Sequence, residues 1–362
     1  MKIAIIHYWL VNLRGGEKVL EALCELYPQA DIFTHVYDAS KFTHSIISKH
    51  KIRTTFISKL PFAKKYYKFY LPFMPLALEE LDLSGYDLVI SSESGPAKGV
   101  IVPPGVPHIC YCHSPMRYMW DMYGEYCARM GKFKKIITAL LSHYIRRWDQ
   151  LSSLQVTNFI ANSEFVAKRI KSYYGRDSVV INPPVDVERF GLSQKSDDYY
   201  LVLGQLVEYK RVDLAVQAFN KSGKRLIVIG DGEQLDELKK MAKENIQILG
   251  YQPFEKIRNY LMNCRALIFP GVEDFGIVPL EAMACGKPVL AFAKGGALET
   301  VRENITGVFF HQQTVECLHN AIIDFENNFV TQPEKIRQHA QQFSKENFKS
   351  KIDSYIRNMI YE

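Results

Sequence analysis

The sequence predicts an α/β protein built from two doubly wound parallel sheets. Short apolar runs rich in β-branched and aromatic residues recur along the chain, and a segment with helical spacing follows most of them. Many of these runs are apolar throughout, which is typical of strands covered by helices on both faces. With 362 residues, of which 47% are hydrophobic, the chain is long for one compact domain, so we expect two.

The expected strands fall into two groups in chain order. Those of the first half are Lys2–His7, Asp31–Val36, Asp87–Ser92, His108–His113 and Asn158–Asn162. Those of the second half are Tyr199–Gly204, Arg225–Gly230, Ile246–Gly250, Ala266–Pro270, Pro288–Ala293 and Gly307–Phe310. Because strands alternate with helical segments, each group should form one parallel sheet.

A break between the two halves is expected from Asn182 to Asp198. Asn182-Pro183-Pro184 stops any regular element, and the polar stretch from Gly191 is rich in turn residues. We therefore predict a first domain over residues 1–182 and a second over 183–342. The last segment has the spacing of an amphipathic helix, with apolar members Phe343, Phe348, Ile352, Tyr355 and Ile356.

Composition excludes several classes of protein. The net charge of +6 is modest, and no nucleic-acid-binding module is recognisable, so no nucleic-acid partner is expected. No apolar run is long enough to span a membrane, and the N-terminus lacks the pattern of a signal peptide. The 7 cysteines lie mostly in apolar runs, which favours free thiols in the cytoplasm. Cys110 and Cys112 are too close for a usual zinc site, so no metal site is expected.

The densest motif runs from Phe269 to Gly286. A buried strand ends at its start, and Pro279 and Gly286 suit the first turn and the end of a following helix. Free N–H groups from Phe275 to Val278 would form an anion site suited to a diphosphate. Glu281 can accept hydrogen bonds from a ribose diol, and Glu273 from sugar hydroxyls. The alternative is an ordinary helix N-terminus with acidic residues near its dipole.

This motif resembles the donor-binding signature of the retaining glycosyltransferases of family 4, also called glycosyltransferase group 1. The resemblance continues through Gly286–Val289, Gly295, Gly296 and Glu299, and backward into Gly230–Gly232, Gly250 and Tyr251. It implies the GT-B fold, in which two Rossmann-like domains face a central cleft and the C-terminal helix crosses back to the first domain. It further implies the following contacts: Glu281 with the ribose, Glu273 with the transferred sugar, backbone N–H groups of Phe275, Gly276 and Ile277 with sugar and phosphates, and Gly250 and Tyr251 with the base.

A second motif runs from Leu203 to Arg211. The family usually carries an arginine after the glycine and a lysine five residues later, and two cations there would stabilise the diphosphate leaving group. Here Lys210 is present and Arg211 follows it, but Gln205 occupies the arginine position. Either Arg211 or another cation substitutes, or turnover is weak. The alternative for Lys210 and Arg211 is a solvated basic turn.

Two further motifs lie in the first half. The run from Tyr111 to Tyr118 resembles a family subgroup typified by O-antigen mannosyltransferases, which implies that His113 faces the donor sugar. Gly15 and Gly16 follow the first strand and match a family loop that touches donor phosphate or acceptor. A third glycine is absent, so hydride chemistry is not expected. The alternatives are a structural histidine at a strand end and a plain strand-to-helix turn.

Two segments mix cations with aromatic or apolar residues. They are Ser58–Tyr70 and Lys132–Trp148. Such mixtures lie on anionic bilayers in some proteins, and the alternative is ordinary helix packing with solvated lysines. The resemblance implies a glycan or a polyprenyl-diphosphate-linked acceptor, so we expect a peripheral position at the inner face of the cytoplasmic membrane.

Taken with the resemblance, the residues predict a metal-independent retaining hexosyltransferase of lipopolysaccharide or capsule synthesis. GDP-mannose is the preferred donor on subgroup resemblance, and UDP-glucose or another UDP-hexose remains open. The first domain would bind the acceptor and the second the donor. The rival functions are a nucleotide-sugar epimerase, a phosphorylase on the same architecture, and a donor-binding protein with a degenerate site, which Gln205 supports.

Overall fold

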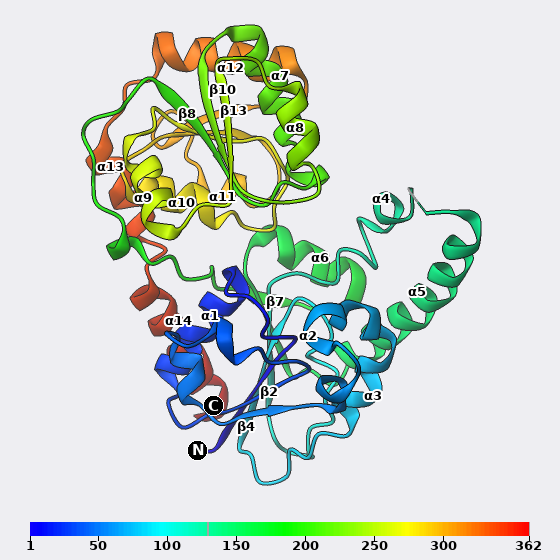
Figure 1. Ribbon diagram of the computed structural model, residues 1–362. Helices are drawn as coiled ribbons and strands as arrows, with labels where there is room; N and C mark the ends of the chain where they lie inside the picture. Colours follow the sequence, from blue (N-terminus) through cyan, green and yellow to red (C-terminus); the bar gives the residue numbers. More distant parts are fainter. Residues whose placement is uncertain (129, 362) are drawn as a thin grey trace. The chain divides into compact units, whose positions relative to one another are not determined.

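The computed structural model describes residues 1–128 and 130–361 of the chain. It divides into two compact units, which are treated separately below. The first unit contains Met1–Pro183 and the C-terminal segment from Phe348, and the second contains Pro184–Asn347. Each unit is built around one parallel sheet with helices on both faces (Figure 1).

The first unit has a sheet in the order β3-β2-β1-β4-β5-β6-β7, and all neighbouring strands run parallel. The strands are β1 Ile3–His7, β2 Asp31–Thr34, β3 Ile52–Thr54, β4 Leu88–Glu93, β5 His108–Cys112, β6 Asn158–Ala161 and β7 Ser178–Val180. The α-helices are α1 Gly15–Leu26, α2 Ala63–Tyr66, α3 Met74–Glu79, α4 Tyr123–Ala128, α5 Lys132–Ser153, α6 Glu164–Tyr174 and α14 Lys345–Tyr361.

The second unit has a sheet in the order β10-β9-β8-β11-β12-β13, again parallel throughout. The strands are β8 Tyr199–Leu203, β9 Arg225–Ile229, β10 Ile246–Gly250, β11 Leu267–Phe269, β12 Val289–Phe292 and β13 Gly307–Phe310. The α-helices are α7 Val212–Ser222, α8 Leu235–Met241, α9 Phe254–Asn263, α10 Ile277–Ala284, α11 Ala297–Thr300, α12 Val315–Asn328 and α13 Pro333–Gln341.

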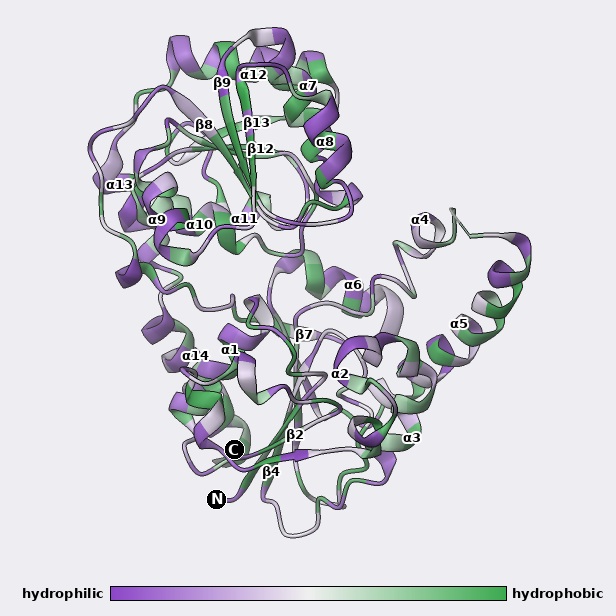
Figure 2. Ribbon diagram, in the orientation of Figure 1, coloured by the Kyte–Doolittle hydropathy of each residue, from purple (hydrophilic) through white to green (hydrophobic). Residues whose placement is uncertain are grey.

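The continuous apolar runs become strands buried on both faces. In β8, Leu201 packs on one side against the core shared with α9, α10 and α13. Tyr200 and Val202 pack on the other side against α7, α8 and α12. Strands of this sheet carry hydrophobic colour in Figure 2. Burial of each such aliphatic side chain contributes about 1.5–3 kcal/mol. The predicted fold class is therefore confirmed.

All the strands expected from apolar runs are present, but β3 and β7 were not expected. Both are three-residue strands at the two edges of the first sheet. Since their residues are mostly exposed or half-buried, they lack the apolar run that marks an inner strand.

The C-terminal helix forms, but Phe343 is not part of it, and that prediction is wrong. Helix α14 begins at Lys345 and packs Phe348, Ile352 and Ile356 into the core of the first unit. Phe343 precedes the helix, and its ring lies 5.7 Å from that of Phe275 in the second unit. The apolar spacing therefore combined side chains that belong to two separate cores.

Candidate functional site

In the second unit, the candidate residues gather on loops at the carboxyl ends of adjacent strands. The segment 204–211 follows β8, and the segment 270–276 follows β11, which is the neighbour of β8 in the sheet. Ligands of doubly wound sheets bind at the carboxyl ends of the strands, at the point where the strand order reverses.

Lys210 and Glu273 meet at this edge. Their Nζ and Oε1 atoms lie 2.9 Å apart, with side-chain exposures of 16% and 24%. Both residues line a small pocket together with Gly204 and Gln205. The structure thus brings together three side chains that the sequence selected from two separate motifs.

The two loops are in close contact at Gly271. A Cβ atom added there would lie 2.7 Å from the Cα atom of Lys210 and 2.9 Å from its carbonyl oxygen. Real side chains do not tolerate such a distance, so the loop after β11 can pass Lys210 only with glycine at position 271. This contact fixes Glu273 beside the lysine.

Helix α10 begins immediately after this loop. Its N-cap is Gly276, with φ 97° and ψ 74°, which offers no side-chain cap, and the first turn of the helix contains no acidic residue. Phe275 is buried in the core, whereas Ile277 is half-buried. The N-terminus of α10 therefore places the positive end of its dipole beside this loop. Glu281 lies on the second turn and is half-buried.

The remaining candidates of this unit lie apart from that pair. Arg211 has a left-handed backbone, with φ 52°, and its guanidinium pairs with Asp213 at 3.2 Å. Gly250 ends β10, the edge strand, and its carbonyl accepts from the Gly230 N–H at 3.0 Å. Tyr251 follows and is 77% exposed. Gly250 and Tyr251 also lie at the carboxyl ends of the strands, but strand β9 separates them from β8. They do not line the pocket of Lys210.

In the first unit, Gly16 and His113 lie at the carboxyl ends of β1 and β5. Gly15 and Gly16 open α1. A Cβ atom on Gly16 would lie 2.3 Å from Tyr8 Oη and 3.6 Å from His113 Nε2, so only glycine fits there. The Nε2 atom of His113 lies 2.8 Å from Ser92 Oγ. Burial, and secondly the electrostatic influence of the neighbouring His7, lower the pKa of His113 to about 3, so this imidazole is neutral.

Sequence reasoning missed the polar groups behind His113, namely His7, Glu17 and Ser92. They are 1%, 3% and 0% exposed. The available signal was that β1 and β4 are apolar strands that end in polar residues, which is unusual for buried positions. A buried cluster of Glu93, Lys98 and Asp149 was missed as well.

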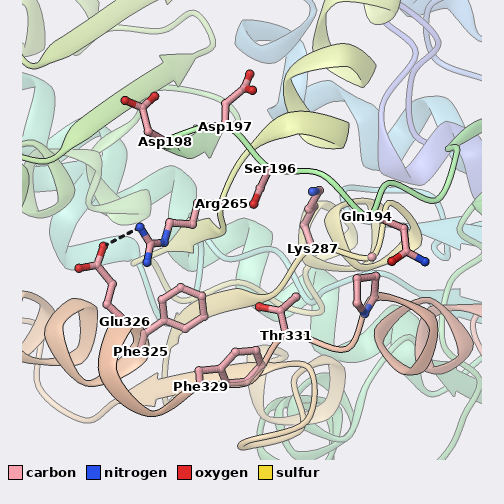
Figure 3. Close-up of a pocket in the computed structure, with 12 residues that line it drawn as sticks. Gln194, Ser196, Asp197, Asp198, Arg265, Lys287, Phe325, Glu326, Phe329 and Thr331 are labelled. Carbon is pink, nitrogen blue, oxygen red and sulfur yellow. Dashed lines mark ion pairs between the residues drawn. The ribbon is translucent and has the colours of Figure 1, made fainter.

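A larger pocket lies at the opposite, amino ends of the strands in the second unit (Figure 3). Its volume is about 560 Å³. The charged side chains in it include Arg265, whose guanidinium pairs with Glu326 at 3.3 Å, and Lys287, which donates to the Lys195 carbonyl. None of the residues selected from the motifs as site candidates lines this pocket.

Within residues 1–128 and 130–361, no group of three or more His, Cys, Asp or Glu side chains could hold a metal ion. Within the same ranges, no helix combines the length and the hydrophobicity needed to cross a bilayer.

Two family models match the chain, one on each half. The model for Glycosyltransferase Family 4 matches residues 13–189, and that for Glycosyl transferases group 1 matches residues 166–343. Together they take in both groups of candidate residues.

Curated relatives match at low identity. The chain is 27% identical over 256 residues to alpha-1,3/1,6-mannosyltransferase ALG2 of Saccharomyces cerevisiae, covering 54% of this chain and 48% of that protein. It is 30% identical over 155 residues to the GDP-mannose-dependent alpha-(1-6)-phosphatidylinositol monomannoside mannosyltransferase of Mycolicibacterium smegmatis, covering 38% of this chain and 40% of that protein. The chain thus spans about half or less of the length of these relatives.

A solved structure matches over the whole chain. It is the structure of Anabaena HepE in complex with UDP-glucose. The two chains are 18% identical and superpose with a TM-score of 0.73, and the match covers 99% of this chain and 100% of HepE. At this identity, the likeness shows the shared fold. The O-antigen subgroup expected from the run around His113 is not among these findings.

Proposed function

Because the chain belongs to the glycosyltransferases of family 4 and group 1, we propose that it moves a hexose from a nucleotide-diphosphate sugar to an acceptor with retained anomeric configuration. The observation that carries this proposal is the Lys210–Glu273 pair, 2.9 Å apart. Glu273 lies on the loop that leads into the N-terminus of α10, where the N-cap is a glycine. A sugar diphosphate requires a cation and backbone N–H donors for its phosphates. It also requires a carboxylate that accepts hydrogen bonds from its sugar hydroxyls.

Each group has a separate task in this proposal. Lys210 and the N–H groups of Phe275, Gly276 and Ile277 bind the diphosphate and stabilise the negative charge that grows on it as the sugar leaves. Glu273 accepts hydrogen bonds from the sugar, and Glu281 accepts from the ribose. Gly250 and Tyr251 flank the base. In the first unit, His113 contacts the transferred sugar, and Gly15 and Gly16 contact phosphate or acceptor.

The reaction is proposed to need no metal ion. A divalent cation in a sugar-nucleotide site neutralises the diphosphate, and here Lys210 and the dipole of α10 provide that stabilisation. Arg211 is a weaker candidate for the second cation, because Asp213 holds its guanidinium.

GDP-mannose is the preferred donor. The Mycolicibacterium relative named above is GDP-mannose-dependent, which favours this choice. A UDP-hexose is the alternative, and it is favoured by the UDP-glucose in the HepE structure. A donor-binding protein with a degenerate site is the third candidate, because Gln205 lacks the charge of the arginine that the family usually carries there.

The acceptor is proposed to be a glycan or a polyprenyl-diphosphate-linked saccharide of surface polysaccharide synthesis, bound by the first unit. Exposed apolar side chains lie on two parts of that unit, including Phe62 and Phe69 at 77% and 78%, and Phe133 and Leu140 at 76% and 70%. Exposed lysines accompany them, at positions 64, 65, 68, 132, 134 and 135. This composition favours a peripheral position on the anionic inner face of the cytoplasmic membrane.

A thermal-shift screen of GDP-mannose, UDP-glucose and other nucleotide sugars tests donor binding. A bound donor should raise Tm by several degrees at saturation, and Glu281→Ala should abolish the rise. Glu316→Ala is the matched control, because this exposed glutamate pairs with Lys221 on the far helices. An unchanged response in Glu281→Ala would reject the proposed ribose contact.

Transfer is tested separately with the donor that binds. We expect product of retained configuration, by NMR of the anomeric proton, and full turnover in excess chelator. An inverted product would reject retention, and strict dependence on a divalent ion would reject metal independence. Calorimetric binding without turnover on any glycan or lipid-linked acceptor would favour the degenerate binding protein. An epimerised donor without acceptor, or stimulation by phosphate, would favour the epimerase or the phosphorylase.

A further inference from the structure

Three buried polar side chains stand in line behind His113. His7 ends β1, Ser92 lies near the end of β4, and Glu17 lies in the first turn of α1. The parallel register pairs His7 directly with Ser92. Burying polar groups costs free energy unless they are hydrogen-bonded to one another, so this line of contacts requires an explanation beyond packing.

The contacts form a continuous path. His7 Nε2 lies 3.6 Å from Glu17 Oε1, which is an ion-pair distance and too long for a hydrogen bond. His7 Nδ1 lies 3.0 Å from Ser92 Oγ, within hydrogen-bond distance. Ser92 Oγ in turn lies 2.8 Å from His113 Nε2. A hydroxyl has a single proton, so Ser92 donates to one imidazole and accepts from the other. The position of the proton on His7 therefore decides the position of the proton on His113.

Glu17 sets the direction of the path. Its Oε2 atom accepts from the Arg14 N–H at 2.8 Å, which leaves Oε1 facing His7. The carboxylate of Glu17 faces Nε2 of His7, so it favours the neutral tautomer of His7 that carries its proton on Nε2. His7 Nδ1 then accepts from Ser92, which leaves Ser92 Oγ to accept from His113.

We propose that Glu17, His7 and Ser92 are positioning residues that hold His113 in the tautomer protonated at Nε2, so that its Nδ1 atom accepts a hydrogen bond from a hydroxyl of the transferred sugar. The inference rests on the proposed function, which puts that sugar at His113. In the described part of the chain, no protein group hydrogen-bonds to Nδ1 of His113. Because this imidazole is neutral, its single proton leaves one lone pair for the sugar.

The tautomer is measured directly, without any donor, from the ¹⁵N chemical shifts of the imidazole nitrogens at neutral pH. We expect His113 to carry its proton on Nε2 in the wild-type protein. A proton on Nδ1 would overturn the proposed direction of the path.

Glu17→Gln gives the sharpest variant. The oxygen of the new side-chain amide keeps the hydrogen bond from the Arg14 N–H, which turns the amide NH₂ toward His7 Nε2 and reverses every donor along the path. We expect His113 to shift to the tautomer protonated at Nδ1, and kcat/KM to fall about tenfold for loss of one hydrogen bond to the sugar. An unchanged tautomer would overturn the role of Glu17.

Ser92→Ala cuts the path, and Ser91→Ala is its matched control. Ser91 is the neighbouring buried serine and makes an equivalent hydrogen bond, 2.9 Å to His108 Nε2, away from His113. We expect mixed tautomers of His113 only in Ser92→Ala, again with about a tenfold loss of kcat/KM. Equal effects of both variants on the His113 signals would reduce Ser92 to a packing residue and overturn the proposal.

A donor titration separates this inference from the proposed function. GDP-mannose or UDP-glucose should shift the Nδ1 signal of His113 in the wild-type protein. Donor binding that leaves this signal in place would reject the sugar contact of His113. If the donor shifts the Nδ1 signal but the tautomer of His113 does not depend on Glu17 and Ser92, the positioning role of these residues is rejected. The proposed function would not be affected by that result.

Discussion

Lys210 pairs with Glu273 at 2.9 Å, although the two side chains come from loops after different strands. The pairing means that the cation and the carboxylate neutralise each other before a donor arrives. A diphosphate would take Lys210 from Glu273 and leave the carboxylate to sugar hydroxyls. Under the proposed function, this ion pair would couple donor binding to positioning of the sugar.

The first prediction concerns the charge of Lys210. Lys210→Ala should lower kcat/KM by about a hundredfold or more, because the diphosphate loses a charged donor as its negative charge grows. Steady-state transfer kinetics check this. Lys221→Ala is the control, since this exposed lysine pairs with Glu316 on the far helices and should leave the kinetics unchanged. Normal turnover of the Lys210→Ala variant would mean that Lys210 does not contact the diphosphate.

The second prediction is a gain from Gln205. This side chain lines the pocket of Lys210 and brings no charge. Gln205→Arg should raise kcat/KM by about tenfold, because a guanidinium forms charge-assisted and often bidentate bonds to phosphate. Gln205→Lys adds the same charge without the planar fork and should gain less. Lower activity of the Gln205→Arg variant would mean that the pocket requires the glutamine and does not accommodate an arginine at position 205.

The third prediction concerns acid lability. His35 and His108 are both 0% exposed. Burial lowers the pKa of His35 to about 4, against an opposing hydrogen bond to the Pro96 carbonyl. Burial and the charge on Lys98 lower the pKa of His108 to about 3. In the unfolded chain both titrate near the ordinary value of about 6.5.

The sign follows from proton binding. Below about pH 6.5 the unfolded chain binds protons on these histidines that the folded chain does not, so the free energy of unfolding falls as the pH falls, by about 1.4 kcal/mol per pH unit for each. Denaturant unfolding between about pH 6.5 and pH 5, above the carboxyl range, measures this slope. His108→Gln should reduce it by about a third or less, because His113 and His339, whose pKa values are also lowered, contribute to the same slope. A flat profile would contradict neutral burial of both side chains.

The fold could be predicted where burial leaves a mark on the sequence. Inner strands such as β8 carry continuous apolar runs because helices cover both faces. The edge strands β3 and β7 bury little, so their residues give no such signal. Phe343 fits the apolar spacing of the last helix but packs against Phe275, because spacing says nothing of which core receives a side chain.

The candidate site could be predicted in part for a similar reason. Lys210 and Glu273 stand in dense local motifs, and the rule that loops meet at the carboxyl edge of a sheet brings them together. The line from Glu17 to His113 could not be predicted, because it depends on the register that pairs His7 with Ser92. A strand that ends in one polar residue does not reveal which neighbour it faces.

The fourth prediction uses the contact between Gly16 and Tyr8. A Cβ atom at position 16 would lie 2.3 Å from Tyr8 Oη, so Gly16→Ala should lower the free energy of unfolding by about 1–3 kcal/mol. In a Tyr8→Phe background the hydroxyl is gone, and Gly16→Ala should become neutral or stabilise the helix by up to about 1 kcal/mol. Urea unfolding of the wild type, both single variants and the double variant checks this. Equal losses in both backgrounds would exclude the hydroxyl as the cause.

The fifth prediction tests the proposed membrane contact of α5. Phe133 and Leu140 are 76% and 70% exposed, and α5 mixes hydrophobic and hydrophilic residues along its length (Figure 2). Combining Phe133→Ser with Leu140→Ser should weaken cosedimentation with anionic vesicles by on the order of tenfold or more, because two apolar side chains no longer leave water.

The matched control for this variant is Val330→Ser, which removes a side chain of similar exposure, 72%, from the second unit. It should bind vesicles as the wild-type protein does, and all variants should keep the Tm rise with donor. Neutral vesicles should bind the wild-type protein less than anionic ones, since the lysines of α5 contribute only against anionic lipid. Unchanged vesicle binding in the doubly substituted protein would mean that the exposed face of α5 does not contact lipid.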